Sequence, residues 1–383
     1  MKKVVVLGAT GSVGSSVLAV IRENPGCFAV SGLAAGHGGP ELVALCREFP
    51  DALVAIHDPE GAALLRDSCD GIASRLLTGP DAGRRLASEV DADICVAAVS
   101  GTAGLGMAFA AARRGMRILL ANKEVLVSAG RLFFAEARRG GAEVIPLDSE
   151  HSALFQCLQG RDPASVNKVI ITASGGPFRD WSAECMAGVA PEDALRHPVW
   201  KMGKKISIDS ASMANKALEI IETSHLFSVP LDSIEVLVHR ESLIHGLIEF
   251  CDGAVLAHLG AADMRLPAAF GLFYPERTKK CFQRLNLAEI GQLHFESPCF
   301  ARFPLLRLGI EAGKRGECAS ATFNAANEMA VDLFLSGKIG FCDMAAVVEV
   351  ALAQARDGDF ASLSAVEDAH QQARECVRKW SGR

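Results

Sequence analysis

After the N-terminal Met, residues Lys2 to Gly14 read KKVVVLGATGSVG, and this stretch decides the fold of the first part of the chain. The apolar run Val4–Leu7 predicts a buried strand, and the glycine-rich sequence Gly8–Gly14 follows it and opens a helical pattern. Glycines there let the backbone turn tightly and approach a pyrophosphate, while the helix N-terminus offers N–H groups to that anion. The stretch predicts a dinucleotide-binding turn, with a purely structural tight turn as the alternative.

Short apolar runs alternate with helical patterns up to about residue 150. This alternation predicts a parallel sheet with helices on both faces. The expected strands are Lys3–Leu7, Ala29–Ala35, Leu53–Ile56, Ile94–Val99, Arg117–Leu120 and Glu143–Pro146, with helices such as Gly14–Asn24 and Arg131–Arg139 between them.

The remainder of the chain has a different pattern. Further strands are expected at Lys168–Ile171, Glu235–His239 and Ala254–Leu259, which indicate a second sheet. Helical periodicity then covers Leu305–Arg315, Ser320–Ser336, Met344–Gln354 and Leu363–Lys379. The predicted fold class is α/β, with an N-terminal Rossmann-like domain, an α+β middle domain and a C-terminal helical bundle.

Composition excludes several classes of protein. Half of the 383 residues are hydrophobic and 22% are charged, so the chain can bury real cores and is not disordered. A net charge of -6 without a long like-charge run argues against a nucleic-acid binder. Glycines and Ser100 interrupt the uncharged stretch Ile94–Ala112, which argues against a membrane span. Twelve scattered cysteines without a CxxC pair predict reduced, mostly buried thiols, and with no signal peptide before Lys2 they favour a cytoplasmic protein.

The end of the second expected strand bears on the choice of cofactor. It reads Ala-Ala-Gly-His-Gly-Gly from Ala34 to Gly39, without the carboxylate that NAD-binding proteins often use to hold the ribose 2′-OH. A missing acid, together with a His37 that can carry a positive charge, fits a 2′-phosphate and favours NADPH. The alternative is a solvated glycine-rich loop with an incidental histidine.

Two carboxylates follow the last strand of the expected parallel sheet. Asp148 and Glu150 are two residues apart, so in an extended chain they would project to one side, at the strand end where open parallel sheets bind ligands. Hard oxygen donors suit Mg²⁺ or Mn²⁺. The alternative is an ordinary helix N-terminus, where acids interact favourably with the helix dipole.

A second polar segment runs from His197 to Glu219. We expect Ser210 to cap a helix, and Asn215 and Glu219 to share one helix face with Lys216 beside them. Serine, asparagine and lysine converging at a helix suit a phosphate, and Glu219 could complete a metal site. Ser174, in the glycine-rich turn Ala173–Pro177, could add another anion contact. The alternative is a surface helix with an incidental Lys–Glu pair.

Together these motifs resemble the 1-deoxy-D-xylulose 5-phosphate reductoisomerase family. The matching segments span nearly the whole chain in the family's order, and their combination is highly specific. They are Gly8–Gly14, Ala121–Glu124, Leu147–His151 with Phe155 and Gln156, Ser174–Phe178, His197–Glu219, Asp263–Arg265 with Pro267, and Asn324–Glu328.

The resemblance implies an NADPH-dependent, divalent-metal-dependent conversion of 1-deoxy-D-xylulose 5-phosphate to 2-C-methyl-D-erythritol 4-phosphate in non-mevalonate isoprenoid synthesis. It implies the metal ligands Asp148, Glu150 and Glu219, binding Mg²⁺ or Mn²⁺ with Co²⁺ as a further candidate. The implied substrate contacts are Lys123, Ser149, Glu150, Ser174, His197, Ser210, Asn215, Lys216 and Glu219, and of these Ser174, Ser210, Asn215 and Lys216 would hold the phosphate. The implied NADPH contacts are Thr10, Gly11, Ser12, Val13, Gly36, His37, Gly38, Asn122, Glu124 and Gly203.

The resemblance also implies a homodimer and a division of the chain into four parts. These are an NADPH-binding domain over 1–148, a catalytic and dimerisation domain over 149–275, a linker over 276–300 and a helical domain over 301–383. A flexible flap near 197–204, around Trp200 and Met202, would close over the substrate.

The chain departs from the family pattern at two places. His37-Gly38 stands where many members have a basic residue followed by Asn, which bears on 2′-phosphate affinity. His239-Arg240-Glu241-Ser242 stands where the family usually has His-Pro-Gln-Ser, in a region that by resemblance lies near the subunit interface.

Two other functions compete with this reading. A semialdehyde dehydrogenase often shares the Gly-Ala-Thr-Gly start but needs a reactive cysteine, whereas Cys95 and Cys157 lie in core patterns. An NADPH-sensing regulator would have lost the carboxylates or the phosphate set, and both are present here. The sequence does not distinguish the metal preferred in vivo, nor a one-step rearrangement from fragmentation and recombination.

Overall fold

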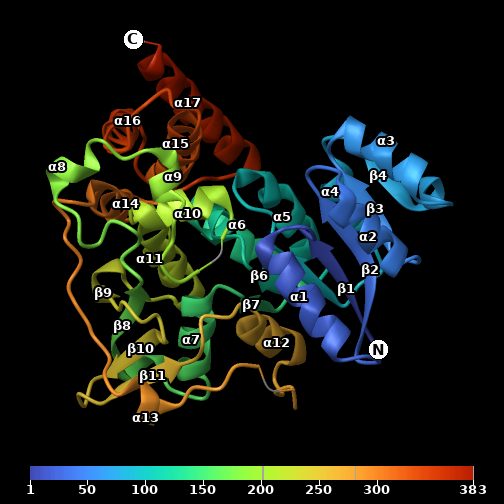
Figure 1. Ribbon diagram of the computed structural model, residues 1–383, viewed down its shortest axis with the longest axis horizontal. Helices are drawn as coiled ribbons and strands as arrows, with labels where there is room; N and C mark the ends of the chain where they lie inside the picture. The colour runs from blue at the N-terminus through green and yellow to red at the C-terminus, as the bar shows by residue number, and fades with distance from the viewer. Residues whose placement is uncertain (201, 281, 383) are drawn as a thin grey trace. The chain divides into compact units, whose positions relative to one another are not determined.

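A computed structural model describes residues 1–200, 202–280 and 282–382 of the chain (Figure 1). Lys201 of the expected flap, Cys281 of the expected linker and the C-terminal Arg383 lie outside the described residues. The chain forms two compact units. The first unit comprises Met1–Val125, Phe133–Ser152 and Asp263–Gln283, and the second comprises Leu126–Leu132, Ala153–Ala262 and Arg284–Arg383. The division into four functional parts stays a prediction.

The first unit is built on a seven-stranded sheet in the order β4-β3-β2-β1-β5-β6-β7, in which neighbouring strands are parallel. The expected Rossmann-like architecture is confirmed. The strands are β1 (Lys2–Leu7), β2 (Phe28–Ala35), β3 (Leu53–Ile56), β4 (Leu76–Thr78), β5 (Ile94–Ala97), β6 (Arg117–Leu120) and β7 (Val144–Pro146). Sequence patterns missed β4, because three partly exposed residues at a sheet edge are too short to show alternation.

Helices connect these strands, and right-handed crossovers place α1–α3 on one face of the sheet and α4–α6 on the other. In agreement, α4 packs beside α5, and α12 packs beside α1 and against β6 and β7 (Figure 1). The helices are α1 (Ser12–Glu23), α2 (Pro40–Glu48), α3 (Pro59–Ser68), α4 (Ala82–Glu89), α5 (Leu105–Arg113), α6 (Lys123–Gly140, kinked at Ala129) and α12 (Arg265–Phe273). The helix α7 (Ser149–Leu158) follows β7 after two residues, Leu147 and Asp148.

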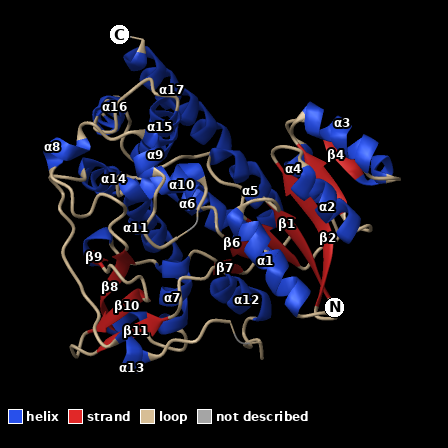
Figure 2. Cartoon of the chain, viewed as in Figure 1, coloured by secondary structure: helices blue, strands red, loops and turns tan. Residues whose placement is uncertain are grey.

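The second unit contains a four-stranded sheet in the order β11-β10-β8-β9, drawn in red beside its helices in Figure 2. Its strands are β8 (Val166–Ala173), β9 (Ile234–Val238), β10 (Ile244–Phe250) and β11 (Val255–Leu259). Strand β8 is parallel to β9 and antiparallel to β10. The second sheet is confirmed, although the sequence analysis did not identify β10, the strand that joins β8 to β11.

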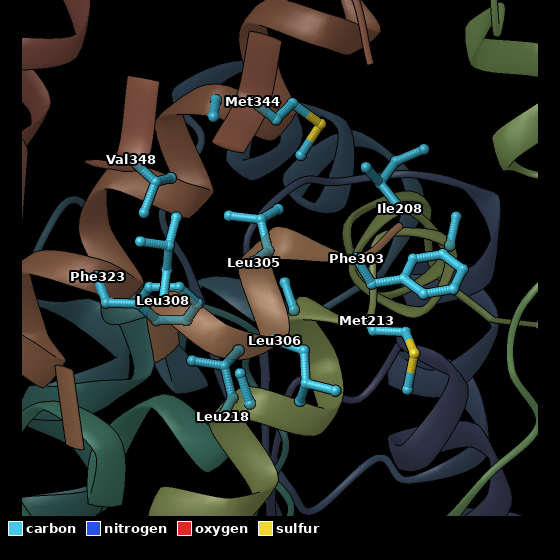
Figure 3. Close-up of a cluster of buried hydrophobic side chains, with 14 of the residues drawn as sticks. Ile208, Met213, Leu218, Phe303, Leu305, Leu306, Leu308, Phe323, Met344 and Val348 are labelled. Carbon is cyan, nitrogen blue, oxygen red and sulfur yellow. The ribbon is translucent and has the colours of Figure 1, made fainter. Parts of the chain in front are cut away.

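The C-terminal helices share one core with the helices that carry the polar segment. Side chains of α10 and α11, such as Ile208 and Leu218, meet Leu306 of α14 and Phe323 of α15 in one buried cluster (Figure 3). The expected C-terminal helices all form, within a few residues of their predicted ends. The helices of this unit are α8 (Ala183–Met186), α9 (Pro191–Ala194), α10 (Lys204–Ala211), α11 (Ala214–Phe227), α13 (Leu287–Ile290), α14 (Pro304–Arg315), α15 (Glu317–Leu335), α16 (Asp343–Leu352) and α17 (Leu363–Ser381).

The cysteines were predicted to be mostly buried, and this prediction is wrong. Of the described cysteines, Cys46, Cys69, Cys95 and Cys157 are buried, while Cys27, Cys185, Cys251 and Cys342 are exposed. The exposed ones lie in turns or in a short helix, outside the apolar runs of the core. Within the described ranges, no helix is both long enough and apolar enough to cross a membrane.

We predict that Gly14→Ala destabilises the protein by about 2 kcal/mol or more, because overpacking against fixed backbone is costly. A Cβ at Gly14 would lie 2.2 Å from the carbonyl oxygen of Gly8. The matched control is Gly36→Ala, whose Cβ would meet nothing within 4 Å. Urea unfolding of both variants checks the prediction, and equal losses of stability would contradict it.

Candidate active site

The turn after β1 has the close backbone packing that a dinucleotide site requires. Gly8 has a φ of +92°, and a Cβ there would lie 2.5 Å from the carbonyl oxygen of Ala98. Helix α1 begins at Ser12, has no acidic residue in its first turn, and receives no cap from its N-cap residue Gly11. Its N-terminal N–H groups and positive dipole end therefore suit an anion. Thr10 and Val13 are partly exposed there, and Gly11 and Ser12 are exposed.

The loop after β2 is held in place by a carboxylate that sequence reasoning missed. Asp58 caps α3 by accepting hydrogen bonds from the Glu60 and Gly61 N–H groups, and its own N–H donates to the Gly36 carbonyl at 3.2 Å. The pKa of Asp58 is lowered, mainly by the hydrogen bond from the Gly61 N–H and to a smaller extent by the nearby His37, which is exposed. An Asp-Pro pair after a strand, a common helix start, was the signal that could have found it.

Gly38 also has a steric role in this loop. A Cβ at Gly38 would lie 2.2 Å from the Cα of Gly61, so the loop packs directly against the first turn of α3. Any larger side chain would displace the loop from that helix.

The first turn of α6 contains three of the candidate residues, and all three are buried. Asn122 caps the helix by accepting from the Val125 N–H at 3.1 Å, and its Nδ2 donates to the Gly101 carbonyl at 2.9 Å and to the Val99 carbonyl. Its side chain is therefore engaged by protein groups. Lys123 and Glu124 follow it, each about 5% exposed.

Asp148 and Lys123 form a close ion pair at the carboxyl end of β7. Lys123 Nζ lies 2.6 Å from Asp148 Oδ2, and Asp148 Oδ1 accepts from the Ser149 N–H at 2.9 Å. Glu150 lies in the first turn of α7 and accepts from the Ser149 hydroxyl. The expected extended conformation is therefore wrong at Glu150, because α7 already begins at Ser149. The first unit supplies two partly buried carboxylates and a lysine next to one another.

In the second unit, Ser174 lies in a turn that packs onto the end of α10. Gly175 and Gly176 both have positive φ, and a Cβ at Gly176 would lie 2.7 Å from the Ser210 carbonyl oxygen. The two glycines thereby allow the Ser174 turn and the Ser210 backbone to come together.

The hydrogen bonds around His197 determine its tautomer. Nδ1 accepts from the Trp200 N–H at 2.8 Å and from the Val199 N–H at 3.2 Å, so the ring proton lies on Nε2. Nε2 therefore donates to Ser174 Oγ at 2.8 Å. The Gly176 N–H donates to the same oxygen at 3.2 Å, which leaves the Ser174 hydroxyl proton available to another acceptor.

The same surroundings keep His197 neutral. Burial lowers its pKa from 6.5 to about 4, and the positive charges of Arg179 and Lys216 add to this effect. Arg179 also donates to the Ser174 carbonyl at 3.0 Å. Arg179 is a residue that the motifs did not identify, and its position just after the glycine-rich turn is the signal that could have found it.

The structure of helices α10 and α11 shows that Ser210 is not a helix cap and that the Lys216–Glu219 pair is not on the surface. Ser210 lies in the last turn of α10 and is not an N-cap, because Met213, with a φ of 60°, separates the two helices. Asn215 and Lys216 both donate to the Glu219 carboxylate, so the predicted shared face is confirmed. The alternative of an incidental surface pair is wrong, because Lys216 is 4% and Glu219 1% exposed.

Arg240, one of the departures from the family pattern, makes contacts within the chain. Its guanidinium lies 2.7 Å from an Asp180 oxygen and 2.6 Å from a Glu296 oxygen. Glu241 pairs with His294. Arg240 thus links the segment after the Ser174 turn to the segment that precedes α14.

Family models match three successive parts of the chain. The model of 1-deoxy-D-xylulose 5-phosphate reductoisomerase matches residues 4–130, and models of the C-terminal domains of that enzyme match residues 144–227 and 259–376. The reductoisomerase of Aromatoleum aromaticum is 47% identical over 385 residues, which cover 99% of this chain and 96% of that one. The chain belongs to the 1-deoxy-D-xylulose 5-phosphate reductoisomerase family.

Other members of the reductoisomerase family agree. The enzyme of Xanthomonas axonopodis pv. citri is 47% identical over 381 residues, covering 99% of this chain and 96% of that one. The solved reductoisomerase of Zymomonas mobilis, in complex with NADPH, has a TM-score of 0.90 at 41% identity and 99% coverage of both chains. A reductoisomerase solved with NADPH, fosmidomycin and magnesium has a TM-score of 0.93 at 38% identity, covering 100% of this chain and 98% of that one.

Membership of the reductoisomerase family agrees with the chemistry of the cysteines. Burial raises the pKa of Cys95, in β5, to about 12, and it also raises the pKa of Cys157, in α7. Neither of these two thiols is a nucleophile at neutral pH, so neither supplies the reactive group that a semialdehyde dehydrogenase needs.

We predict that His197 stays neutral from pH 7.5 down to about pH 5, because its pKa is lowered to about 4. The unfolded chain takes up this proton near the ordinary value of 6.5. The stability that the neutral ring contributes is therefore complete above pH 6.5 and is lost as the pH falls from 6.5 towards 4. Titration of the assigned His197 ring signals by nuclear magnetic resonance checks this, and a midpoint near 6.5 would contradict it.

Proposed function

We propose that this protein catalyses the NADPH-dependent and divalent-metal-dependent conversion of 1-deoxy-D-xylulose 5-phosphate to 2-C-methyl-D-erythritol 4-phosphate. The observation that carries the proposal is 47% identity to a named reductoisomerase over 99% of the chain. Helix α11 also supports it, because Lys216, one of the residues expected to hold the phosphate, is buried there with the partly buried Asn215 beside it.

The first unit would bind NADPH at the turn after β1. Its pyrophosphate would lie at the N-terminus of α1, where the Gly8 and Gly14 backbones leave no room for a side chain. The loop that Asp58 holds would face the 2′-phosphate. The proposed contacts are Thr10, Gly11, Ser12, Val13, Gly36, His37, Gly38, Asn122, Glu124 and Gly203, and the bound nicotinamide supplies the hydride.

Asp148, Glu150 and Glu219 would hold one Mg²⁺ or Mn²⁺ ion. Their oxygen donors suit hard divalent cations, and three carboxylates more than balance the charge of such an ion. When bound, the ion supplies Lewis-acid polarisation of the substrate carbonyl. Lys123 contacts the Asp148 carboxylate at 2.6 Å, so it can orient this ligand.

Ser174, Ser210, Asn215 and Lys216 would hold the phosphate of the substrate. Ser174 is prepared for this role, because two N–H groups donate to its oxygen and leave its proton free to donate to the anion. Lys216 supplies a buried positive charge, and such charge-assisted bonds are the strong ones. His197 acts as a neutral donor that orients Ser174, and the segment 197–204 would exclude water when it closes.

We also propose that the protein is a cytoplasmic homodimer. The edge strand β11 exposes Val255 and Leu259, which are 53% and 37% accessible. An apolar edge strand is a natural surface for self-association. Analytical ultracentrifugation of the full chain tests the dimer.

The function is tested by following NADPH oxidation with 1-deoxy-D-xylulose 5-phosphate as substrate. We expect turnover with Mn²⁺ or Mg²⁺, none after chelation, and at least about a tenfold higher kcat/KM for NADPH than for NADH because the end of β2 lacks an acid. Absence of turnover with both metals would refute the proposal, and equal use of NADH would refute the assignment of the cofactor loop.

We predict that Glu219→Gln weakens Mn²⁺ binding and lowers turnover by orders of magnitude, because Lewis-acid stabilisation contributes several kcal/mol. Electron paramagnetic resonance of free Mn²⁺ gives the binding, and circular dichroism gives stability, since Lys216 loses its buried partner. Glu150→Gln, at a less buried carboxylate, is the companion variant if Glu219→Gln does not fold. Unchanged Mn²⁺ affinity in a folded variant would remove that carboxylate from the metal site.

A further inference from the structure

The Asn324-Ala325-Ala326-Asn327-Glu328 motif of α15 has no role in the site described above. Asn324 and Asn327 are both fully buried, one helical turn apart. Buried amides need a hydrogen-bonding reason to be in a core, because desolvating them is otherwise unfavourable. The two asparagines have different partners, and this difference points to different roles.

Asn324 is engaged within its own helix and with the last helix. Its Nδ2 donates to Glu328 Oε1 at 3.2 Å, and Glu328 in turn pairs with Arg374 of α17 at 2.6 Å. This set of contacts holds α15 to α17 inside the C-terminal helices.

Asn327 instead contacts the helix next to the anion-binding residues. Its Nδ2 donates to Asp209 Oδ1 of α10 at 2.7 Å. Asp209 is 1% exposed and also pairs with Lys205 at 2.9 Å. In the part of the chain that the structure describes, Asp209 is the side-chain hydrogen-bond partner of Asn327, and the amide oxygen has none. Among the described residues, the amide oxygen of Asn324 likewise has no partner, so the feature that distinguishes Asn327 is its bond to the buried Asp209.

The position of Asp209 affects the position of the residues proposed to bind the phosphate. Asp209 precedes Ser210, whose carbonyl oxygen is packed against Gly176 of the Ser174 turn. One residue later α10 ends, and Met213 leads into α11 with Asn215 and Lys216. A shift of Asp209 by a few tenths of an ångström would therefore move Ser210 against the Ser174 turn, because packed interiors transmit strain.

We infer that Asn327 is a positioning residue for the phosphate-binding set, acting through Asp209 from the C-terminal helices. The inference rests on the proposed function, since that function makes the anion a substrate phosphate. Asn327 is not among the proposed substrate or cofactor contacts, and its amide donates to the Asp209 carboxylate near the end of α10. Supporting contacts of this kind are what hold a binding constellation to its productive geometry.

The test compares Asn327→Ala with the matched control Asn324→Ala. Both variants remove a fully buried amide from the same helix and should lose similar stability, which thermal unfolding measures. Only Asn327→Ala should lower kcat/KM for 1-deoxy-D-xylulose 5-phosphate, on the order of 10- to 100-fold, because misplacement of binding groups costs this much. Its KM for NADPH should stay within about twofold, since all of the proposed NADPH contacts except Gly203 belong to the other unit.

A second set of variants exchanges the amide and the carboxylate between the two positions and tests whether activity is restored. Asn327→Asp alone sets two carboxylates against each other, and Asp209→Asn with Asn327→Asp restores one amide and one acid. We expect the double variant to recover kcat/KM at least about tenfold over Asn327→Asp, a coupling that double-mutant cycles isolate. This comparison also decides the question if Asn327→Ala does not fold.

Equal kcat/KM losses in the two alanine variants, or no recovery in the swap, would overturn the inference. If the wild-type chain does not turn over the sugar phosphate, the proposed function is what fails. The positioning role is then judged by calorimetric affinity for inorganic phosphate in the same variants. A weaker affinity in Asn327→Ala than in Asn324→Ala supports it, and equal affinities overturn it.

Discussion

The buried ion pair between Lys216 and Glu219 is the constraint on which the rest of the second unit depends. Both groups are at most 4% exposed, and two charges can leave water only if each is paired and hydrogen-bonded. Asn215 supplies a further donor to Glu219. Well-packed apolar residues would stabilise α11 as well as this pair does, so its presence favours a binding role over a purely structural one.

The packing around α11 follows from the need to keep the Lys216–Glu219 ion pair buried. Ala217 of α11 packs against Gly309 of α14, and a Cβ on the glycine would lie 2.4 Å from the Ala217 Cβ. This close approach lets α14 pack tightly against α11. The C-terminal helices are therefore part of the core that supports the site. His197 is kept neutral, because burial and the positive charges of Arg179 and Lys216 disfavour a further cation there.

The first unit meets a different constraint, which is close approach of backbone to ligand. Gly8 and Gly14 are packed against neighbouring backbone, so the turn is already tightly packed without a cofactor. Preorganisation of this kind reduces the ordering cost of binding. Asp58 extends it to the next loop by fixing Gly36.

The elements that could be predicted from the sequence are those whose signal is local. The strand and glycine turn at Lys2–Gly14, the parallel alternation, the C-terminal helices and the shared face of Asn215, Lys216 and Glu219 all follow from periodicity and motif. The burial of side chains, the tautomer of the histidine ring and the contacts between distant residues became known only from the tertiary structure. It showed the Lys216–Glu219 pair to be buried, placed the His197 proton on Nε2, and brought Asn327 to Asp209 across 118 positions. Sequence periodicity carries no information about which element covers a helix face, because that depends on the packing of segments far apart in the chain.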